Sequence, residues 1–202
     1  MIYGAKFWND RDRCYYRQDN NPTEQLLKKR EEEGWLESCG PTAAVNCLAA
    51  LGYNLKILCP GPYLPQPEEI LMDFFNDPRN YDELEKIRAD VLNAHLGNRI
   101  PQFYPHAVKQ VFGAIGVFVW VSGYVKTISY LKHGWTLQLC IVDPGHYIAA
   151  VAYDDESSEI IYNDPWPAGV GGNGFNQRLN IAEFDRNVKK FAIIYKEQKY
   201  AD

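Results

Sequence analysis

The sequence lacks the regularly spaced, paired cysteines that are typical of a disulfide-stabilised protein. Its 202 residues include five cysteines, an odd number, and no C-x-x-C pair. They are Cys14, Cys39, Cys47, Cys59 and Cys140. This pattern argues against a disulfide scaffold and against a structural zinc site. We expect neither a metal nor a cofactor, and at least one thiol stays unpaired within the chain.

Basic residues are also too few for a nucleic-acid-binding protein. Acidic residues number 26 and basic residues 21, giving a net charge of −5, whereas phosphate binding requires a basic face. The longest apolar run, Val111 to Tyr124, is broken by glycine and serine and is shorter than a membrane helix. The first residues lack the basic and apolar segments of a secretory signal. We expect a soluble, cytoplasmic protein without membrane insertion, with export by host lysis or a non-Sec route left open.

The order of helical and strand patterns predicts the fold class. The length, with 46% apolar and 23% charged residues, fits one packed domain over residues 1–202. Apolar periodicity predicts helices at 22–33, 40–51, 68–76, 82–96, 104–112, 125–132 and 181–187. β-Branched and aromatic runs predict strands at 117–121, 137–142, 146–153, 159–163 and 191–195. This order indicates an α+β domain with a mainly antiparallel sheet and the helices on one side.

One cysteine lies at the start of a predicted helix. Cys39 precedes Gly40 and Pro41, and a proline suits the first helical turn. The partial positive charge of a helix N-terminus favours the thiolate, which is the nucleophilic form of cysteine. Gly40 is expected to leave room for a substrate backbone. The alternative interpretation is a buried cysteine at a helix start, and Cys47 and Cys140 fall in apolar patterns typical of the core.

A nucleophilic cysteine needs a histidine as base and a third group to orient that histidine. His146 begins one predicted strand and Asp164 follows the next. A hairpin centred on Asp155 would place His146 directly opposite Asp164, with their Cβ atoms about 5 Å apart. A slip of one residue would put the two on opposite faces. Alternatively, both residues have only local turn roles, and Asn163 is a second possible orienting group.

Two further segments have no predicted chemistry. The glycine-rich stretch Ala168 to Phe175 lacks the lysine and the dinucleotide spacing of phosphate-binding loops, so we expect a loop beside the site or a plain surface loop. The acidic turn Asp154 to Glu156 supplies few ligands, so we expect a solvated hairpin turn rather than a cation site.

Four segments together resemble papain-like cysteine peptidases. They are Y-Y-R-Q-D-N (15–20), C-G-P-T-A-A-V-N-C-L (39–48), G-H-Y (145–147) and N-D-P-W (163–166). More narrowly, they are similar to the bacteriocin-processing, double-glycine-leader peptidase-like family. The resemblance spans residues 14–195, with a helical insertion at about 22–34. It implies a papain-like fold and a thiol-dependent hydrolase that cleaves a peptide bond through an acyl-enzyme.

The resemblance also implies roles for individual residues. Cys39 corresponds to the nucleophile, His146 to the base and Asp164 to the orienting acid. The family's oxyanion glutamine normally lies shortly before the cysteine, where this chain has Glu33, which cannot donate while ionised. The donor is therefore assigned to Gln18.

The substrate contacts implied by the resemblance are less specific. Gly40, Gly145 and Trp166 are expected to contact the substrate, and Gln25 is the second choice as oxyanion donor. The partner is a peptide or protein, with a cell-wall peptide as one possibility.

Two other functions stay open. The same triad could serve a cell-wall amidase or isopeptidase, because one fold hosts many acyl transfers. A non-catalytic peptide-binding module is the third hypothesis, suggested by Glu33 and by aromatic residues such as Trp8, Trp35 and Trp166.

Overall fold

The computed structural model describes residues 1–18, 38–55, 66–80, 82, 100–120, 123–142, 145–166 and 173–197. The predicted helices at 22–33 and 82–96 lie outside these residues, apart from Asp82. The same holds for Gln25, Glu33 and Cys59.

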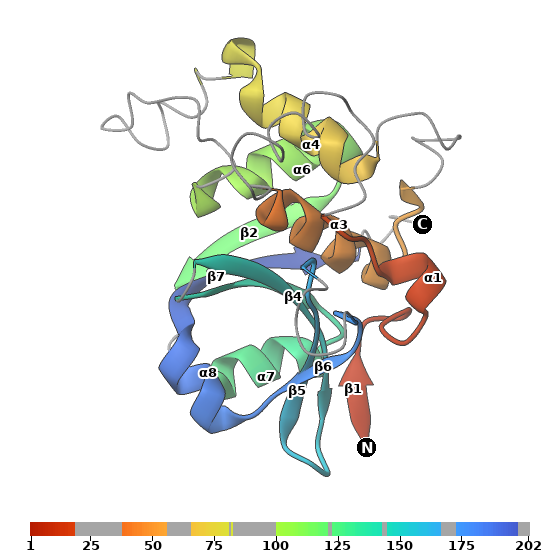
Figure 1. The fold of residues 1–202 in the computed structure, drawn as a ribbon, viewed down its shortest axis with the longest axis vertical. Helices are drawn as coiled ribbons and strands as arrows, with labels where there is room; N and C mark the ends of the chain where they lie inside the picture. The colour runs from red at the N-terminus through yellow and green to blue at the C-terminus, as the bar shows by residue number, and fades with distance from the viewer. Residues whose placement is uncertain are drawn as a thin grey trace.

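A seven-stranded sheet lies at the centre of the described chain, and all its strand pairs are antiparallel (Figure 1). Its strands are β1 (Ile2–Gly4), β2 (Ile115–Trp120), β3 (Thr136–Ile141), β4 (His146–Asp154), β5 (Glu159–Asn163), β6 (Gln177–Leu179) and β7 (Val188–Lys196). Their order is β2-β7-β3-β4-β5-β6, and β1 pairs with β4. The five predicted strands are confirmed, whereas β1 and β6 were not predicted, because three residues give too short a pattern.

The described helices match predicted ones except for the first, a four-residue helix that was not predicted. They are α1 (Arg11–Cys14), α3 (Cys39–Leu51), α4 (Pro67–Asn76), α6 (Tyr104–Phe112), α7 (Tyr124–Lys132) and α8 (Ile181–Asn187), with 3-10 turns at Pro78–Asn80 and Pro101–Phe103. Gly52 ends α3 in the left-handed conformation, with φ of 108°. The helix starts and ends thus agree with the caps and breakers in the sequence.

Helices cover both faces of the sheet, so the prediction that they pack on one side is wrong. Figure 1 shows α3 on one face and α7 and α8 on the other. Ala149 and Val151 of β4 pack into the same core as α3, whereas the alternate residues Ile148 and Ala150 pack into the core that contains α7. A strand that is apolar on both faces needs a cover on each. The continuous apolar run of β4 already carried this signal.

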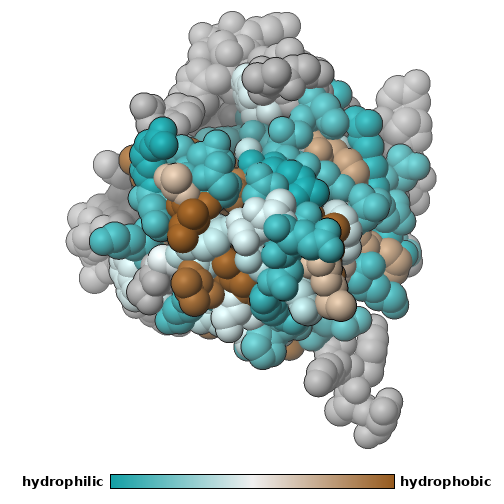
Figure 2. Space-filling view, turned by 90° about the horizontal axis from the view of Figure 1, so that it is seen from below, coloured by the Kyte–Doolittle hydropathy of each residue, from teal (hydrophilic) through white to brown (hydrophobic). Residues whose placement is uncertain are grey.

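The surface seen from below in Figure 2 mixes apolar and polar residues. The most exposed apolar side chains of α7 and α8 are Val125 and Ile181, at 77% and 52%. Scattered apolar side chains of this kind are ordinary for a protein surface. None of the described helices is long and apolar enough to span a membrane.

Side chains on β3 hold α3 to the sheet at two places. The Thr136 hydroxyl donates to the carbonyl of Cys47 at 3.2 Å, and the Gln138 amide donates to the carbonyl of Gly40 at 3.0 Å. These bonds set the direction of α3, whose N-terminus lies toward the end of β3. That strand end pairs with the start of β4, where Ile141 is opposite His146. Cys39 and His146 therefore meet at the same edge of the molecule.

Candidate active site

Cys39 is the first residue of α3, one residue before the predicted helix start at Gly40 and next to the N-cap. Ser38 is the N-cap residue, and Pro41 lies in the first turn. The backbone N–H and the hydroxyl of Thr42 both donate to the carbonyl of Ser38, at 2.9 and 2.8 Å. The helix start is therefore fixed by bonds on the residue before the thiol, and the thiol lies close to the positive end of the helix.

The other described cysteines are unlike Cys39. Cys39 is partly exposed, whereas Cys14, Cys47 and Cys140 are buried. Burial raises the pKa of all three buried thiols, that of Cys14 to about 11. Such thiols stay protonated and unreactive at neutral pH. The core positions predicted for Cys47 and Cys140 are confirmed.

His146 connects Cys39 to Asp164. Its Nε2–H donates to Asp164 Oδ1 at 2.6 Å, and the imidazole is also hydrogen-bonded to Cys39. Because Nε2 is engaged with the carboxylate, Nδ1 is the ring nitrogen left for the thiol. The three residues thus form a continuous chain of hydrogen bonds.

The surroundings of the imidazole favour its charged form. Burial alone would lower the pKa of His146, but the hydrogen bonds with Asp164 and Cys39, with the charges of both groups, outweigh it. Together these effects raise the pKa from 6.5 to about 9. A protonated imidazole next to the Cys39 sulfur is the arrangement that nucleophilic catalysis by cysteine uses.

The register by which His146 was predicted to reach Asp164 is wrong in detail. The β4–β5 hairpin pairs Asp154 with Glu159, so the turn centre lies beyond Asp155, and a bulge at Val151 shifts the register again. The last pair is Ala149 with Asn163. Extending this register by one residue places Asp164 opposite Ile148 rather than opposite His146. The two side chains therefore meet diagonally on one face, within reach of an imidazole and a carboxylate. The shift by two residues preserves the face, which is why the pair still forms.

The Asp164 carboxylate and backbone are held from three directions. Its Oδ1 also accepts the backbone N–H of Trp166 at 2.8 Å, and its own N–H donates to Gly174 at 2.7 Å. The Tyr15 hydroxyl donates to the Asp164 carbonyl and accepts the Gly174 N–H, both at 3.1 Å. A Cβ at Gly174 would lie 2.1 Å from the Asp164 carbonyl oxygen, so only glycine fits there. Sequence reasoning missed Tyr15, although it stands in the quoted Y-Y-R-Q-D-N segment.

Gln18 lies between the two halves of the site. It is 2% exposed, and its backbone N–H donates to the carbonyl of Pro165 at 3.0 Å. The Ser38 hydroxyl donates to the Gln18 carbonyl at 3.5 Å. The residue after Asp164 and the residue before Cys39 therefore both contact the main chain of Gln18. Its assignment as oxyanion donor stays a prediction.

The three predicted substrate contacts have different surroundings. Gly40 is buried, and a Cβ there would lie 2.0 Å from the Tyr104 hydroxyl, so the expectation that Gly40 makes room for a substrate is wrong. The missing side chain makes room for Tyr104 instead. Gly145 is exposed with φ of 88°, a conformation that favours glycine immediately before His146. Trp166 is half-buried beside Asp164, and the substrate roles of Gly145 and Trp166 stay predictions.

The acidic turn of the β4–β5 hairpin is paired with cations of the protein. Arg178 contacts Asp154 at 2.9 Å and Glu159 at 3.1 Å, and Lys132 contacts Asp155 at 2.9 Å. The N-terminal amine of Met1 contacts Glu156 at 3.6 Å, so each acidic residue of the turn has a cationic partner. Within the described ranges, no group of three or more potential ligands could hold a metal ion.

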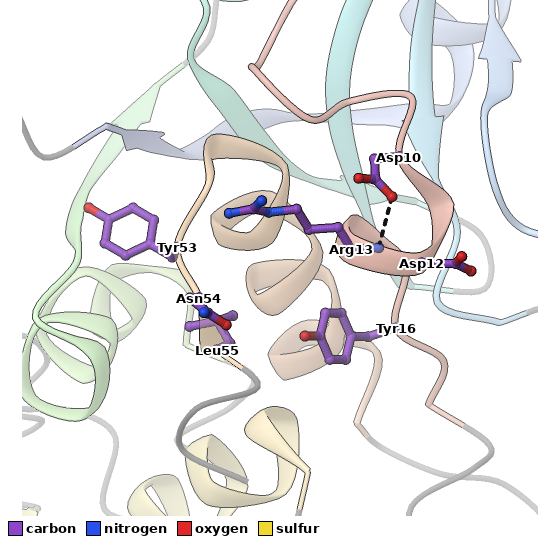
Figure 3. Close-up of a pocket in the computed structure, with 7 residues that line it drawn as sticks. All are labelled: Asp10, Asp12, Arg13, Tyr16, Tyr53, Asn54 and Leu55. Carbon is purple, nitrogen blue, oxygen red and sulfur yellow. Dashed lines mark hydrogen bonds between the residues drawn. The ribbon is translucent and has the colours of Figure 1, made fainter. Parts of the chain in front are cut away.

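A pocket at the other end of α3 is separate from this cluster (Figure 3). It lies between α1 and the segment after α3 and is lined by Asp10, Asp12, Arg13, Tyr16, Tyr53, Asn54 and Leu55. None of these lining residues belongs to the chain of bonds from Cys39 to Asp164. The pocket is therefore not the reaction centre.

The chain matches a known protein family. Residues 12–192 match the model of the Peptidase_C39 like family. The matched range includes Gln18, Cys39, His146 and Asp164. The comparison with curated proteins gives no match.

Proposed function

Because the chain belongs to the Peptidase_C39 like family and has a papain-like α+β fold, we propose that it is a cysteine peptidase acting through Cys39, His146 and Asp164. The observation that carries the proposal is the bonded series from the thiol at the helix start, through the imidazole, to the carboxylate. Thiol-dependent acyl transfer requires an accessible thiol, a histidine that exchanges protons with it and an acidic residue that orients the histidine.

The first half of the reaction acylates the enzyme. The Cys39 thiolate attacks the substrate carbonyl carbon, and a sulfur–carbon bond forms while negative charge develops on the oxygen. The backbone N–H of Cys39 and the side chain of Gln18 stabilise that charge. The His146 imidazolium then gives its proton to the leaving nitrogen, the carbon–nitrogen bond breaks, and a thioester on Cys39 remains.

The second half restores the site. Neutral His146 takes a proton from water, and the hydroxide so formed attacks the thioester carbonyl carbon. The sulfur–carbon bond breaks, the acid product leaves, and Cys39 returns as a thiolate beside an imidazolium. Asp164 keeps Nε2 of the ring bonded and so keeps Nδ1 directed at the sulfur in both halves. No proton needs to reach Asp164 itself.

The test compares peptide and cell-wall substrates with one set of variants. Wild-type protein is assayed on casein, on a peptide library and on peptidoglycan in zymograms. Cys39→Ala should abolish hydrolysis, while Cys47→Ala, a core cysteine of the same helix, should retain it. Hydrolysis of peptidoglycan alone would assign the same triad to an amidase or isopeptidase. Hydrolysis that survives in Cys39→Ala would contradict the proposal, and peptide binding without hydrolysis by either protein would favour a binding module.

A further inference from the structure

A buried polar network lies directly beneath the thiol-bearing turn of α3. Its centre is Gln138 of β3, which is fully buried. The Gln138 amide nitrogen donates to the Gly40 carbonyl at 3.0 Å, and its oxygen accepts the Tyr195 hydroxyl at 2.6 Å. The Tyr104 hydroxyl is also hydrogen-bonded to Gln138. A buried amide costs free energy unless its hydrogen bonds are made, and here each polar atom of the amide has a partner.

The network holds residue 40 from two sides. Gln138 bonds its carbonyl, and the Tyr104 hydroxyl fills the space where a side chain would stand. Gly40 is joined directly to Cys39 through one peptide bond. A shift of the Gly40 carbonyl therefore displaces the thiol as well.

The same network connects the thiol to the sheet that carries the base. Gln138 lies on β3 opposite Ala149, and three residues further on Ile141 is opposite His146. Tyr195, which fixes the orientation of the amide, lies on β7, the other neighbour of β3. The positions of Cys39 and His146 are thus both fixed by the same set of paired strands.

We propose that Gln138 is a positioning residue, which acts through Gly40 to hold the Cys39 sulfur against the His146 imidazole. The inference rests on the proposed function. Without the hydrogen bond from the Gln138 side-chain amide to the Gly40 carbonyl, the first turn of α3 is no longer tied to β3 at this point. The Cys39 sulfur then moves away from Nδ1 of His146. Misplacement of a reacting group by about 1 Å can reduce a rate about 100-fold.

Thr136 offers a matched control, because its side chain makes the other bond from β3 to α3. Thr136 and Gln138 are both fully buried, two residues apart on the same strand, and each donates to an α3 carbonyl. The Thr136 bond reaches Cys47, two helical turns away from Cys39. A general loosening of α3 affects both variants, whereas loss of thiol positioning affects only the Gln138 variant.

The experiment measures the alkylation rate of Cys39 by iodoacetamide between pH 5 and 10, together with kcat and KM on a substrate identified by the casein, peptide-library or peptidoglycan assay. The proteins are wild type, Gln138→Met, Tyr195→Phe and Thr136→Val, all assayed well below their Tm. We expect Gln138→Met to lose about 10-fold or more in kcat and in the alkylation rate near neutral pH, with little change in KM. Tyr195→Phe should show a smaller loss in the same sense, and Thr136→Val should keep the wild-type pH profile.

The outcomes separate this inference from the proposed function. If wild-type Cys39 reacts no faster than a free thiol, the proposed function fails and the inference fails with it. If wild-type Cys39 is activated but Gln138→Met keeps its pH profile and kcat, only the inference is overturned. Equal losses in Thr136→Val and Gln138→Met at equal Tm would also overturn it. Should Gln138→Met fail to fold, Tyr195→Phe decides, and an unchanged profile in that variant contradicts the proposal.

Discussion

His146 and Asp164 are 2.6 Å apart, Nε2 to Oδ1, although the two residues are not opposite each other in the β4–β5 ladder. The bulge at Val151 sets the register in which the pair meets diagonally. The same Oδ1 also accepts the Trp166 N–H at 2.8 Å. The carboxylate therefore has a fixed position before it engages the imidazole, and this limits the rotation of the ring.

Replacing Asp164 by asparagine separates position from charge. The asparagine oxygen can still accept from Trp166 and from His146, but the negative charge that helps to keep the imidazole protonated is lost. We expect kcat/KM to fall at least about 10-fold, and the alkaline limb of the pH–rate profile to move to lower pH. Asp164→Ala should fall further because the bonds are lost too. An unmoved alkaline limb in Asp164→Asn would show that the carboxylate does not govern the ionisation of His146.

The stability of the protein should depend on pH through His146. The folded-state pKa of about 9 lies above the ordinary 6.5, so the folded state binds the proton more tightly than the unfolded chain. This stabilisation is complete below pH 6.5 and is lost as the pH rises through about 9. At about 1.4 kcal/mol per pKa unit, the loss is about 3 kcal/mol.

The measurement for this effect is urea unfolding of wild type and His146→Gln at pH 6 and pH 10. The difference between the two proteins isolates His146 from other groups that titrate over the same interval, including Glu68, whose pKa burial raises to about 8. The wild-type advantage at pH 6 should shrink at pH 10. A difference that is the same at both pH values would contradict the raised pKa of His146.

Tyr15 should support activity through the backbone of Asp164. Tyr15→Phe removes a hydroxyl that bonds the Asp164 carbonyl and the Gly174 N–H. We expect a loss of about 1 kcal/mol in stability and a lower kcat. Tyr53→Phe is the control, since its hydroxyl donates to a backbone carbonyl, that of Lys196, away from the site. If both variants lose stability equally and kcat equally, Tyr15 has no role beyond folding.

Gln18 should matter for hydrolysis but not for alkylation. Attack on a carbonyl creates an oxyanion, and removal of one donor to it typically costs about 10²–10³ in kcat. Attack on iodoacetamide creates none at the reacting carbon, so Gln18→Ala should keep the alkylation rate of Cys39. Parallel losses in the two reactions would point to a displaced thiol, and unchanged hydrolysis would exclude Gln18 as the donor.

Local sequence patterns predicted most of the described fold. The helices at 104–112 and 181–187 and the strand at 159–163 have the predicted bounds, because proline, glycine and asparagine mark their ends. The second helical layer was missed although the apolar run of β4 implied it. The bulge at Val151 depends on packing against elements far away in the sequence, which no local pattern contains.

The sequence predicted those site residues whose side chains are themselves reactive and lie in short motifs. Cys39 at a helix start and His146 at a strand start follow from short motifs, and the helix start is now confirmed. Tyr15 and Gln138 were not found, because their importance comes from hydrogen bonds to backbone carbonyls of distant residues. The one signal for Gln138 is a lone polar residue within an apolar strand, L-Q-L-C. The expectation that Gly40 leaves room for a substrate was wrong because the Tyr104 hydroxyl fills that space, and Tyr104 is distant in sequence.

The site and the pH dependence of thiol labelling test whether His146 activates Cys39. Wild type and His146→Ala are treated with substoichiometric iodoacetamide from pH 5 to 10, and labelled cysteines are located by peptide mass spectrometry. We expect wild type to be labelled at Cys39 far faster than at Cys14, Cys47 or Cys140, already at pH 6, and His146→Ala to lose this reactivity below pH 8. Equal labelling of the accessible thiols, or a Cys39 rate that does not depend on His146, would contradict the activation of Cys39 by His146.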